Sequence, residues 1–253
     1  MTRTLAASLL AISSSLLAVG TANAQDVSYN VGVDYVGEYV FRGFSLAEDA
    51  IQPYVEASVG GFTVGAWAST GFGAGSELYD DEIDLYAGYS VPMEGPVSLD
   101  LGVTYYHYPQ GGPLLSTRDG GSGSYEFSVA AGFGDVVLAP SVAAYYDVTL
   151  ETFTLEGAVG HSVGFGDKNG LDLGLTLGAV EADGGGDYQW AHASVALNHS
   201  LSDDASVYVG ANYAINSEDN TLDLERFAAG ANESFVRSDD DLLWFAVGIS
   251  AGF

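Results

Sequence analysis

Apolar residues alternate with polar or small residues in many short segments of this chain, and this alternation restricts the fold more than any other feature. Segment 171–178, which reads LDLGLTLG, is the clearest example. An α-helix would distribute residues at spacing two over different faces, whereas a β-strand places them all on one face. The alternating segments are therefore predicted to be strands with one apolar face.

The spacing of these segments predicts about twelve strands, most of them about 9–11 residues long, the length that a tilted strand needs to cross a bilayer. They are expected at 27–41, 51–59, 62–70, 82–91, 97–107, 124–133, 136–146, 152–164, 171–180, 188–201, 206–215 and 242–253. Tight turns are expected at 60–61, 92–96, 134–135, 165–170 and 202–205. Connections at the other end are longer and acidic at 42–50, 71–81, 108–123, 181–187 and 216–241, and short only at 147–151.

An even number of strands with turns at one end and loops at the other predicts an all-β fold, a transmembrane antiparallel up-and-down β-barrel with both termini in the periplasm. A soluble β-sandwich is the alternative. Two features favour the barrel. Large apolar residues keep the odd-numbered phase through almost every strand, and the last strand is apolar at every second position up to a terminal Phe, including Phe245, Val247, Ile249 and Phe253. Such an ending resembles the signal by which the barrel-assembly machinery recognises outer-membrane barrels.

Pro140 fits poorly, because it lies in the middle of the strand expected at 136–146 and a closed barrel has no free edge to tolerate a missing N–H. A bulge or a shifted strand boundary would resolve the conflict.

Residues 1–24 are interpreted as a cleaved secretory signal peptide that precedes one barrel domain at 25–253. Arg3 provides a positive start, the segment 5–19 is apolar, and Ala22 and Ala24 fit a small-residue cleavage site. An anchoring helix is disfavoured because the apolar run is shorter than the roughly 20 residues of a bilayer span.

The charge balance excludes several functions. The chain has 34 Asp and Glu against 6 Lys and Arg, a formal charge of −28 and no Cys. A nucleic-acid partner is not expected, because binding would need a positive surface. Thiol catalysis and cysteine-based metal sites are excluded as well, and neither a cofactor nor a metal centre is predicted.

Four successive motifs resemble those of the TorF-type porin family, also called the Gcw_chp family. They are DYVGEYVFRGFS at 34–45, GFTVGAWAS at 61–69, EIDLYAGYS at 82–90 and GVTYYHYP at 102–109, and the segment Tyr39–Gly43 is the most distinctive part. Leu46 departs from the pattern, since a Gln is common there. The resemblance implies a porin-like protein in the outer membrane of a Gram-negative bacterium, and it supplies no site residues.

If odd-numbered residues face lipid, a set of carboxylates points inward and lines a pore. The set is Asp34, Glu38, Glu56, Glu82, Asp84, Asp100, Glu126, Glu156 and Asp172. Arg42 is the one obvious basic partner. Ionised carboxylates in a water-filled lumen enrich cations, so the hypothesis is a diffusion channel for small hydrophilic solutes that prefers cations. The alternative explanation of the charge is a saline habitat or a general solubility bias.

Other functions are weighed against this channel. A closed barrel would act in adhesion or envelope integrity through its acidic loops, which could also bind divalent ions or contact lipopolysaccharide. A lipid hydrolase is the remote alternative: His192 and Ser194 share a strand face, but that face points into the barrel and no Gly-x-Ser-x-Gly elbow is present. The expected partners are outer-membrane lipids, lipopolysaccharide, the assembly machinery and small solutes. Homo-oligomerisation is left open.

Overall fold

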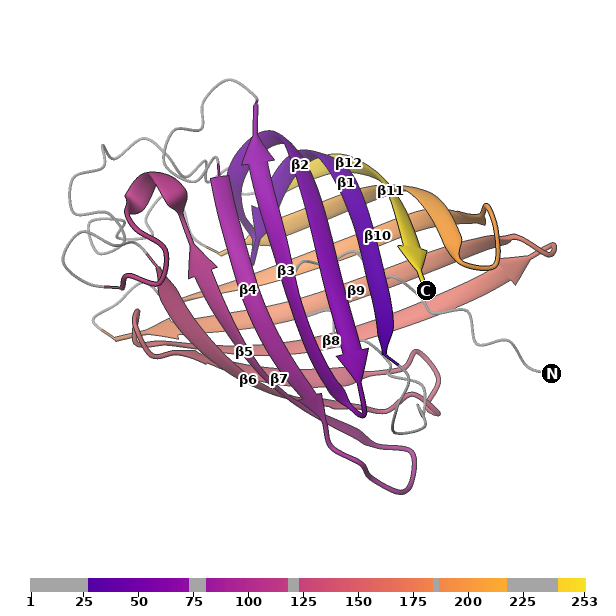
Figure 1. Cartoon of the computed structure of the whole chain (residues 1–253), viewed down its shortest axis with the longest axis horizontal. Coiled ribbons are helices and arrows are strands. Elements are labelled where there is room, and N and C mark those ends of the chain that lie inside the picture. The colour runs from indigo at the N-terminus through magenta and orange to yellow at the C-terminus, as the bar shows by residue number, and fades with distance from the viewer. Residues whose placement is uncertain (1–26, 73–80, 118–122, 184–186, 218–240) are drawn as a thin grey trace.

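The chain folds into a closed β-barrel of twelve antiparallel strands in the described residues (Figure 1). The structure, a computed structural model, describes residues 27–72, 81–117, 123–183, 187–217 and 241–253. The strands are β1 (Ser28–Phe41), β2 (Phe44–Val59), β3 (Phe62–Gly71), β4 (Asp81–Ser90), β5 (Ser98–His107), β6 (Ser124–Gly132), β7 (Ser141–Asp147), β8 (Thr152–Phe165), β9 (Asn169–Ala182), β10 (Tyr188–Ser200), β11 (Ala205–Asn216) and β12 (Asp241–Gly252).

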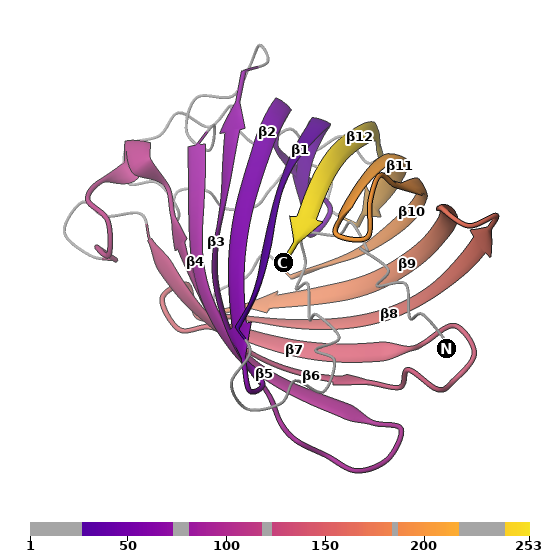
Figure 2. The ribbon, with the colours of Figure 1, turned by 45° about the vertical axis from the view of Figure 1, so that its right-hand side comes forward.

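Each strand pairs with its neighbours in the sequence, and β1 pairs with β12 to close the ring. The closing register runs from Asn30 opposite Gly252 to Val36 opposite Ala246. Figure 2 shows the strands tilted around this ring, with the start of β1 and the end of β12 at the same end of the barrel. The predicted all-β up-and-down barrel is therefore confirmed. No helix in the described part of the chain is long and apolar enough to span a membrane.

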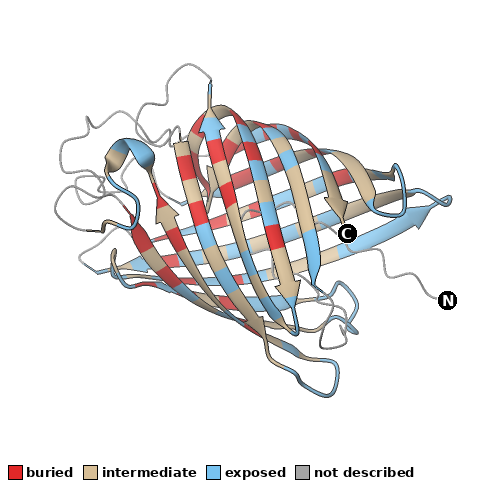
Figure 3. Cartoon of the chain, in the orientation of Figure 1, coloured by how far each residue is buried: buried red, intermediate tan, exposed pale blue. Residues whose placement is uncertain are grey.

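Buried and exposed residues alternate along the strands (Figure 3), and the exposed ones include many large apolar side chains whereas the buried ones include most of the carboxylates and aromatic rings of the interior, as the alternation predicted. On β12, Leu243 and Phe245 are 66% and 62% exposed, whereas Leu242 and Trp244 are 4% and 8% exposed. Exposed large apolar side chains continue in this way over most strands. A continuous apolar outer surface around a polar interior is the arrangement of a membrane barrel and the reverse of a soluble one.

The strand predicted at 136–146 is wrong in its first half. β7 begins at Ser141, and residues 133–140 form a turn in which the N–H of Phe133 donates to the carbonyl of Pro140 at 2.9 Å. Pro140 thus lies just before the strand, where no ladder hydrogen bond is required of it. The phase of β7 is also inverted, since Ala143, Tyr145 and Asp147 are the buried residues.

The loop predicted at 42–50 is wrong as well. β1 and β2 are joined by a two-residue turn at Arg42-Gly43, and β2 starts at Phe44. The predicted signal peptide and most of the long acidic connections lie outside the described residues.

Candidate functional site in the barrel interior

The end of the first hairpin leaves the barrel wall and enters the interior. The pairing of β1 with β12 stops at Val36, and the pairing of β2 with β3 begins at Ala50. Residues 38–48, here called the hairpin tip, therefore have strand partners only in each other. Gly43, Phe44 and Ser45 are all buried, whereas burial alternates along the wall strands. A hairpin is buried on both faces only when it is surrounded, and the tip lies inside the barrel.

The local sequence accounts for the turn at the end of the tip. Arg42 and Gly43 have φ values of 48° and 88°, the positive pair of a type I′ turn, which suits the twist of a two-residue hairpin. A register shift between Tyr39 and Val40 marks a bulge, which increases the local bend.

One side of the tip packs against β10 and β11. The Phe44 ring lies edge-on to Tyr188 with centroids 4.7 Å apart, and Asn216 Nδ2 donates to the carbonyl of Gly43 at 2.8 Å. A β-carbon on Gly43 would lie 2.8 Å from Trp190 Cβ. Only glycine therefore fits at this position without displacement of the tip.

The other side of the tip carries Arg42 toward β6, β7 and β8. Its Nη1 and Nη2 atoms donate to Glu126 Oε2 and Oε1 at 2.7 and 2.9 Å, and its Nε lies 3.4 Å from Glu156 Oε1. The guanidinium carbon is 4.8 Å from the ring centroids of Phe41 and Tyr145. The expectation that Arg42 partners the inward carboxylates is confirmed.

Tyrosine hydroxyls complete the contacts of the tip with the wall. Tyr39 of the tip donates to Glu82 at 2.7 Å, and within the wall Tyr106 donates to Glu126, the partner of Arg42, at 2.9 Å. Phe41 packs on Tyr106 with centroids 5.9 Å apart. The tip is thus held from opposite sides of the barrel, and it narrows the interior at the end where the longer connections lie.

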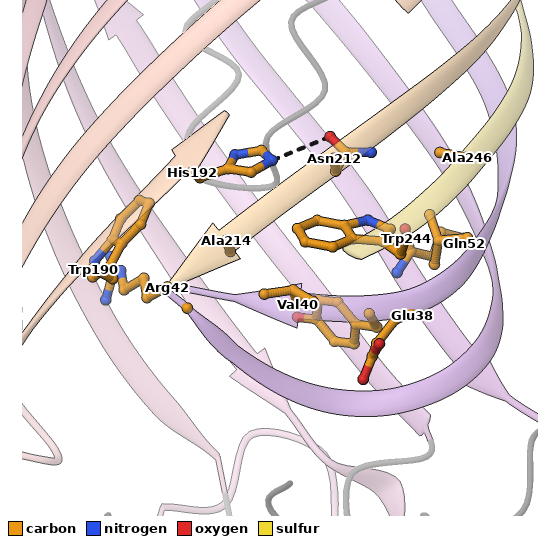
Figure 4. Close-up of a pocket in the computed structure, with 13 residues that line it drawn as sticks. Glu38, Val40, Arg42, Gln52, Trp190, His192, Asn212, Ala214, Trp244 and Ala246 are labelled. Atoms are coloured by element: carbon orange, nitrogen blue, oxygen red, sulfur yellow. Dashed lines mark hydrogen bonds between the residues drawn. The ribbon is translucent and has the colours of Figure 1, made fainter. Parts of the chain in front are cut away.

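A small cavity remains between the tip and β10, β11 and β12. Its volume is about 50 Å³, and Glu38, Arg42, Trp190 and Trp244 are among the residues that line it (Figure 4). This space is enough for one or two water molecules. Passage of a larger solute on this side would require the tip to move.

The structure places the predicted carboxylates on the inner face. Glu56, Glu82, Asp84, Asp100, Glu126 and Glu156 are buried, and Asp34, Glu38 and Asp172 are half-buried. Away from the tip they accept hydrogen bonds from neutral groups, namely Asp34 from Tyr208 at 2.8 Å, Glu56 from Tyr86 at 2.9 Å, Asp100 from Ser90 at 2.5 Å and Asp172 from Asn198 at 2.6 Å. These hydrogen bonds bring no positive charge to the carboxyl groups.

Sequence reasoning missed Tyr145 and Asp147, because their strand was assigned the wrong boundary. It also missed the tip, whose mixture of aromatic, small and acidic residues does not alternate. The turn signal was present, since a glycine in the second position of a two-residue loop favours a type I′ turn.

His192 contacts two other side chains of the barrel wall. Its Nε2 lies 3.1 Å from Asn212 Oδ1, and its ring stacks on Trp244 with centroids 5.3 Å apart. The described residues contain no cluster of three or more His, Asp or Glu able to hold a metal ion. The residues predicted as an insertion signal lie on the outer face, where Phe245, Val247, Ile249 and Phe253 are 46–73% exposed.

A closed twelve-stranded barrel with an apolar exterior and a polar interior is the architecture of outer-membrane-type β-barrels. The model of the Gcw_chp family, described as a bacterial protein of unknown function, matches residues 18–120. The match agrees with the resemblance inferred from the motifs, and it includes the whole hairpin tip.

Solved porin structures share the fold. The NanC porin is 12% identical with a TM-score of 0.51, and the alignment covers 88% of this chain and 98% of that one. The KdgM porin is 11% identical with a TM-score of 0.53, and the alignment covers 89% and 99%. A structure of the KdgM porin in complex with disordered oligogalacturonate is 10% identical with a TM-score of 0.54 and the same coverage. The curated proteins include no significant match.

Proposed function

We propose that the protein is a narrow outer-membrane channel for passive diffusion of small hydrophilic solutes and that it prefers cations. The observation that carries the proposal is the composition of the interior. In the described residues it contains the nine predicted carboxylates and one arginine, Arg42. Among the described residues, Lys168 is the other Lys or Arg, and it lies in the exposed turn between β8 and β9. An uncompensated negative potential in a narrow lumen concentrates cations and repels anions.

The acidic interior also indicates the charge of the solutes that the channel would accept. Oligogalacturonate, present in the KdgM complex, carries a carboxylate on each sugar unit. The inner face described here would repel such a polyanion, so neutral or cationic solutes are the expected substrates. We therefore do not propose oligogalacturonate as a solute of this protein.

Ion selectivity tests the proposal. Purified, refolded protein in planar bilayers under a salt gradient should give a reversal potential of the sign expected for cations. Replacement of Glu56 and Asp100 by Gln and Asn, at the end away from the tip, should reduce that potential. A reversal potential of the opposite sign in the wild type would contradict the cation preference.

A closed barrel that acts through its loops is the second candidate, and the hairpin tip favours it by filling part of the lumen. Conductance separates the two functions. Absence of single-channel events and of liposome swelling with small sugars or amines, in protein shown to be folded, would support the closed barrel.

Export and assembly complete the proposal. We expect cleavage after Ala24, testable by N-terminal sequencing of the protein from outer membranes. The exposed apolar face of β12 is expected to guide insertion by the assembly machinery. Loss of Phe253 should lower the amount of assembled barrel and leave synthesis unchanged.

A further inference from the structure

Arg42 occupies a site on the barrel wall that has the chemistry of a guanidinium receptor. Glu126 accepts two parallel hydrogen bonds from the two terminal nitrogens, at 2.7 and 2.9 Å. The Tyr145 ring lies 4.8 Å from the guanidinium carbon. A carboxylate fork beside an aromatic face recognises the shape and charge of a planar cation together.

Arg42 leaves part of this site unsatisfied. Glu156 Oε1 and Arg42 Nε are buried without a hydrogen-bond partner and lie 3.4 Å apart. The exposed fractions of the Glu126 and Glu156 side chains are 5% and 6%. Two buried carboxylates therefore face one cation, and Arg42 contacts Glu156 through an ion pair that lacks hydrogen-bond geometry. The contact with Glu156 is longer than the two hydrogen bonds to Glu126, so a guanidinium free of the backbone could approach Glu156 more closely than Arg42 does.

The connection of Arg42 to the barrel allows it to leave. It sits at the end of the hairpin tip, and residues 38–48 share no strand pairing with the wall. Displacement of Arg42 breaks contacts of the tip and leaves the twelve-strand ring intact. Arg42 also has a φ of 48°, a left-handed conformation that is unfavourable for a residue with a β-carbon.

We propose that Glu126, Glu156 and Tyr145 form a binding site for solutes that carry a guanidinium group, and that Arg42 is the internal ligand that fills the site in their absence. An entering solute competes with Arg42, and its binding releases the tip from β6, β7 and β8. The inference rests on the proposed channel. It adds the class of solute, and it adds that binding of this solute moves the tip and so widens the lumen. Competition with a tethered ligand requires a high solute concentration, since the tether keeps Arg42 at a high effective concentration.

Removal of the internal ligand tests the site directly. Binding of methylguanidinium to refolded full-length protein in detergent is measured by isothermal titration calorimetry at constant ionic strength. Arg42→Ala should bind saturably and at least about tenfold more tightly than wild type, a difference of about 1.4 kcal/mol. Arg42→Ala combined with Glu126→Gln should lose this binding.

Three controls define the result. Lys168→Ala removes a positive charge in an exposed turn and should bind as wild type does. Urea has the planar shape without the charge and should not bind to Arg42→Ala. Equal binding of methylammonium would overturn the assignment to guanidinium solutes. If Arg42→Ala does not fold, Arg42→Lys serves instead, because lysine keeps the charge and lacks the fork.

A folded Arg42→Ala protein that does not bind methylguanidinium, or a Glu126→Gln double variant that binds it equally well, would overturn the inference. Conductance of the same samples in planar bilayers distinguishes this failure from failure of the channel. Binding without conductance would contradict the proposed channel and support the site. Conductance without binding would contradict the site and support the channel.

Discussion

The barrel wall and the hairpin tip differ in how their strands are paired and in which of their faces are buried. In the wall, each strand has a strand on both sides and exposes one apolar face, so its sequence alternates. In the tip, residues 38–48 pair only with each other and are surrounded by the interior. Tyr39 and Phe44 are each 2% exposed, yet neither lies in a segment where apolar and polar residues alternate.

The difference shows that two kinds of stability coexist in this molecule. The wall depends on contact between its outer face and hydrocarbon and on a continuous hydrogen-bond ladder. The tip depends on a few specific contacts, above all those of Arg42, Gly43 and Tyr39. Substitutions should therefore affect the wall according to membrane depth and the tip according to the individual contact that is lost.

The largest effect is expected from a charge in the middle of the outer face. Val195 is 41% exposed near the centre of β10, and Val195→Arg should reduce the free energy of unfolding by about 2–4 kcal/mol. Ile215, 43% exposed near the end of β11, is the control, and Ile215→Arg should cost only about 0–1 kcal/mol. Denaturant unfolding in lipid vesicles measures both. Equal costs would contradict the proposed orientation of the outer face toward hydrocarbon.

Loss of the Arg42 charge should have the next largest effect. Arg42→Met keeps the length of the side chain and leaves two buried carboxylates without their cation, at a cost of about 2–3 kcal/mol. Adding Glu126→Gln should recover part of that cost, because one of the unpaired charges is then removed. A double-mutant cycle measured by denaturant unfolding gives the coupling energy. Additive effects of the two substitutions would show that the ion pair is not formed.

Gly43→Ala should disturb the tip to a smaller extent. Gly43 and Gly60 both have positive φ, 88° and 55°, but a β-carbon on Gly60 meets nothing within 4 Å. Because the Gly43 β-carbon would contact Trp190, Gly43→Ala should cost about 1–2 kcal/mol more than Gly60→Ala. The same unfolding measurement applies to both. Similar costs would indicate that the tip does not pack on β10.

The smallest effect concerns single hydroxyl groups. Tyr39→Phe removes the hydrogen bond to buried Glu82 and should cost about 0.5–1.5 kcal/mol. Tyr35→Phe removes an exposed hydrogen bond to Asp49 and should leave the stability nearly unchanged. Thermal unfolding in detergent compares the two variants. A larger loss from Tyr35→Phe would reverse the contrast between the interior and the surface.

The wall could be predicted from the sequence because each of its strands alternates between residues that face hydrocarbon and residues that face the interior. The alternation in 171–178 or 243–253 needs no partner to be recognised. Pro140 indicated an error in one predicted strand, but the length of the turn at 133–140 depends on the pairing of Phe133 with Pro140. Since a shift of one residue inverts the phase, Tyr145 and Asp147 were missed.

The candidate site was predictable in composition and not in arrangement. The inward carboxylates and Arg42 were recognised by parity and by the scarcity of basic residues. Which carboxylates Arg42 contacts depends on β6 and β8, which lie far from it in sequence and reach it only through closure of the ring.

The sequence by itself determined that this chain forms strands with an apolar face, roughly how many there are, and that their other face is acidic, because these properties depend on neighbouring residues alone. Only the tertiary structure decided that the first hairpin folds inward and that Arg42 joins Glu126 and Glu156. Such contacts exist only after a closed ring brings residues more than 80 positions apart to within hydrogen-bond distance.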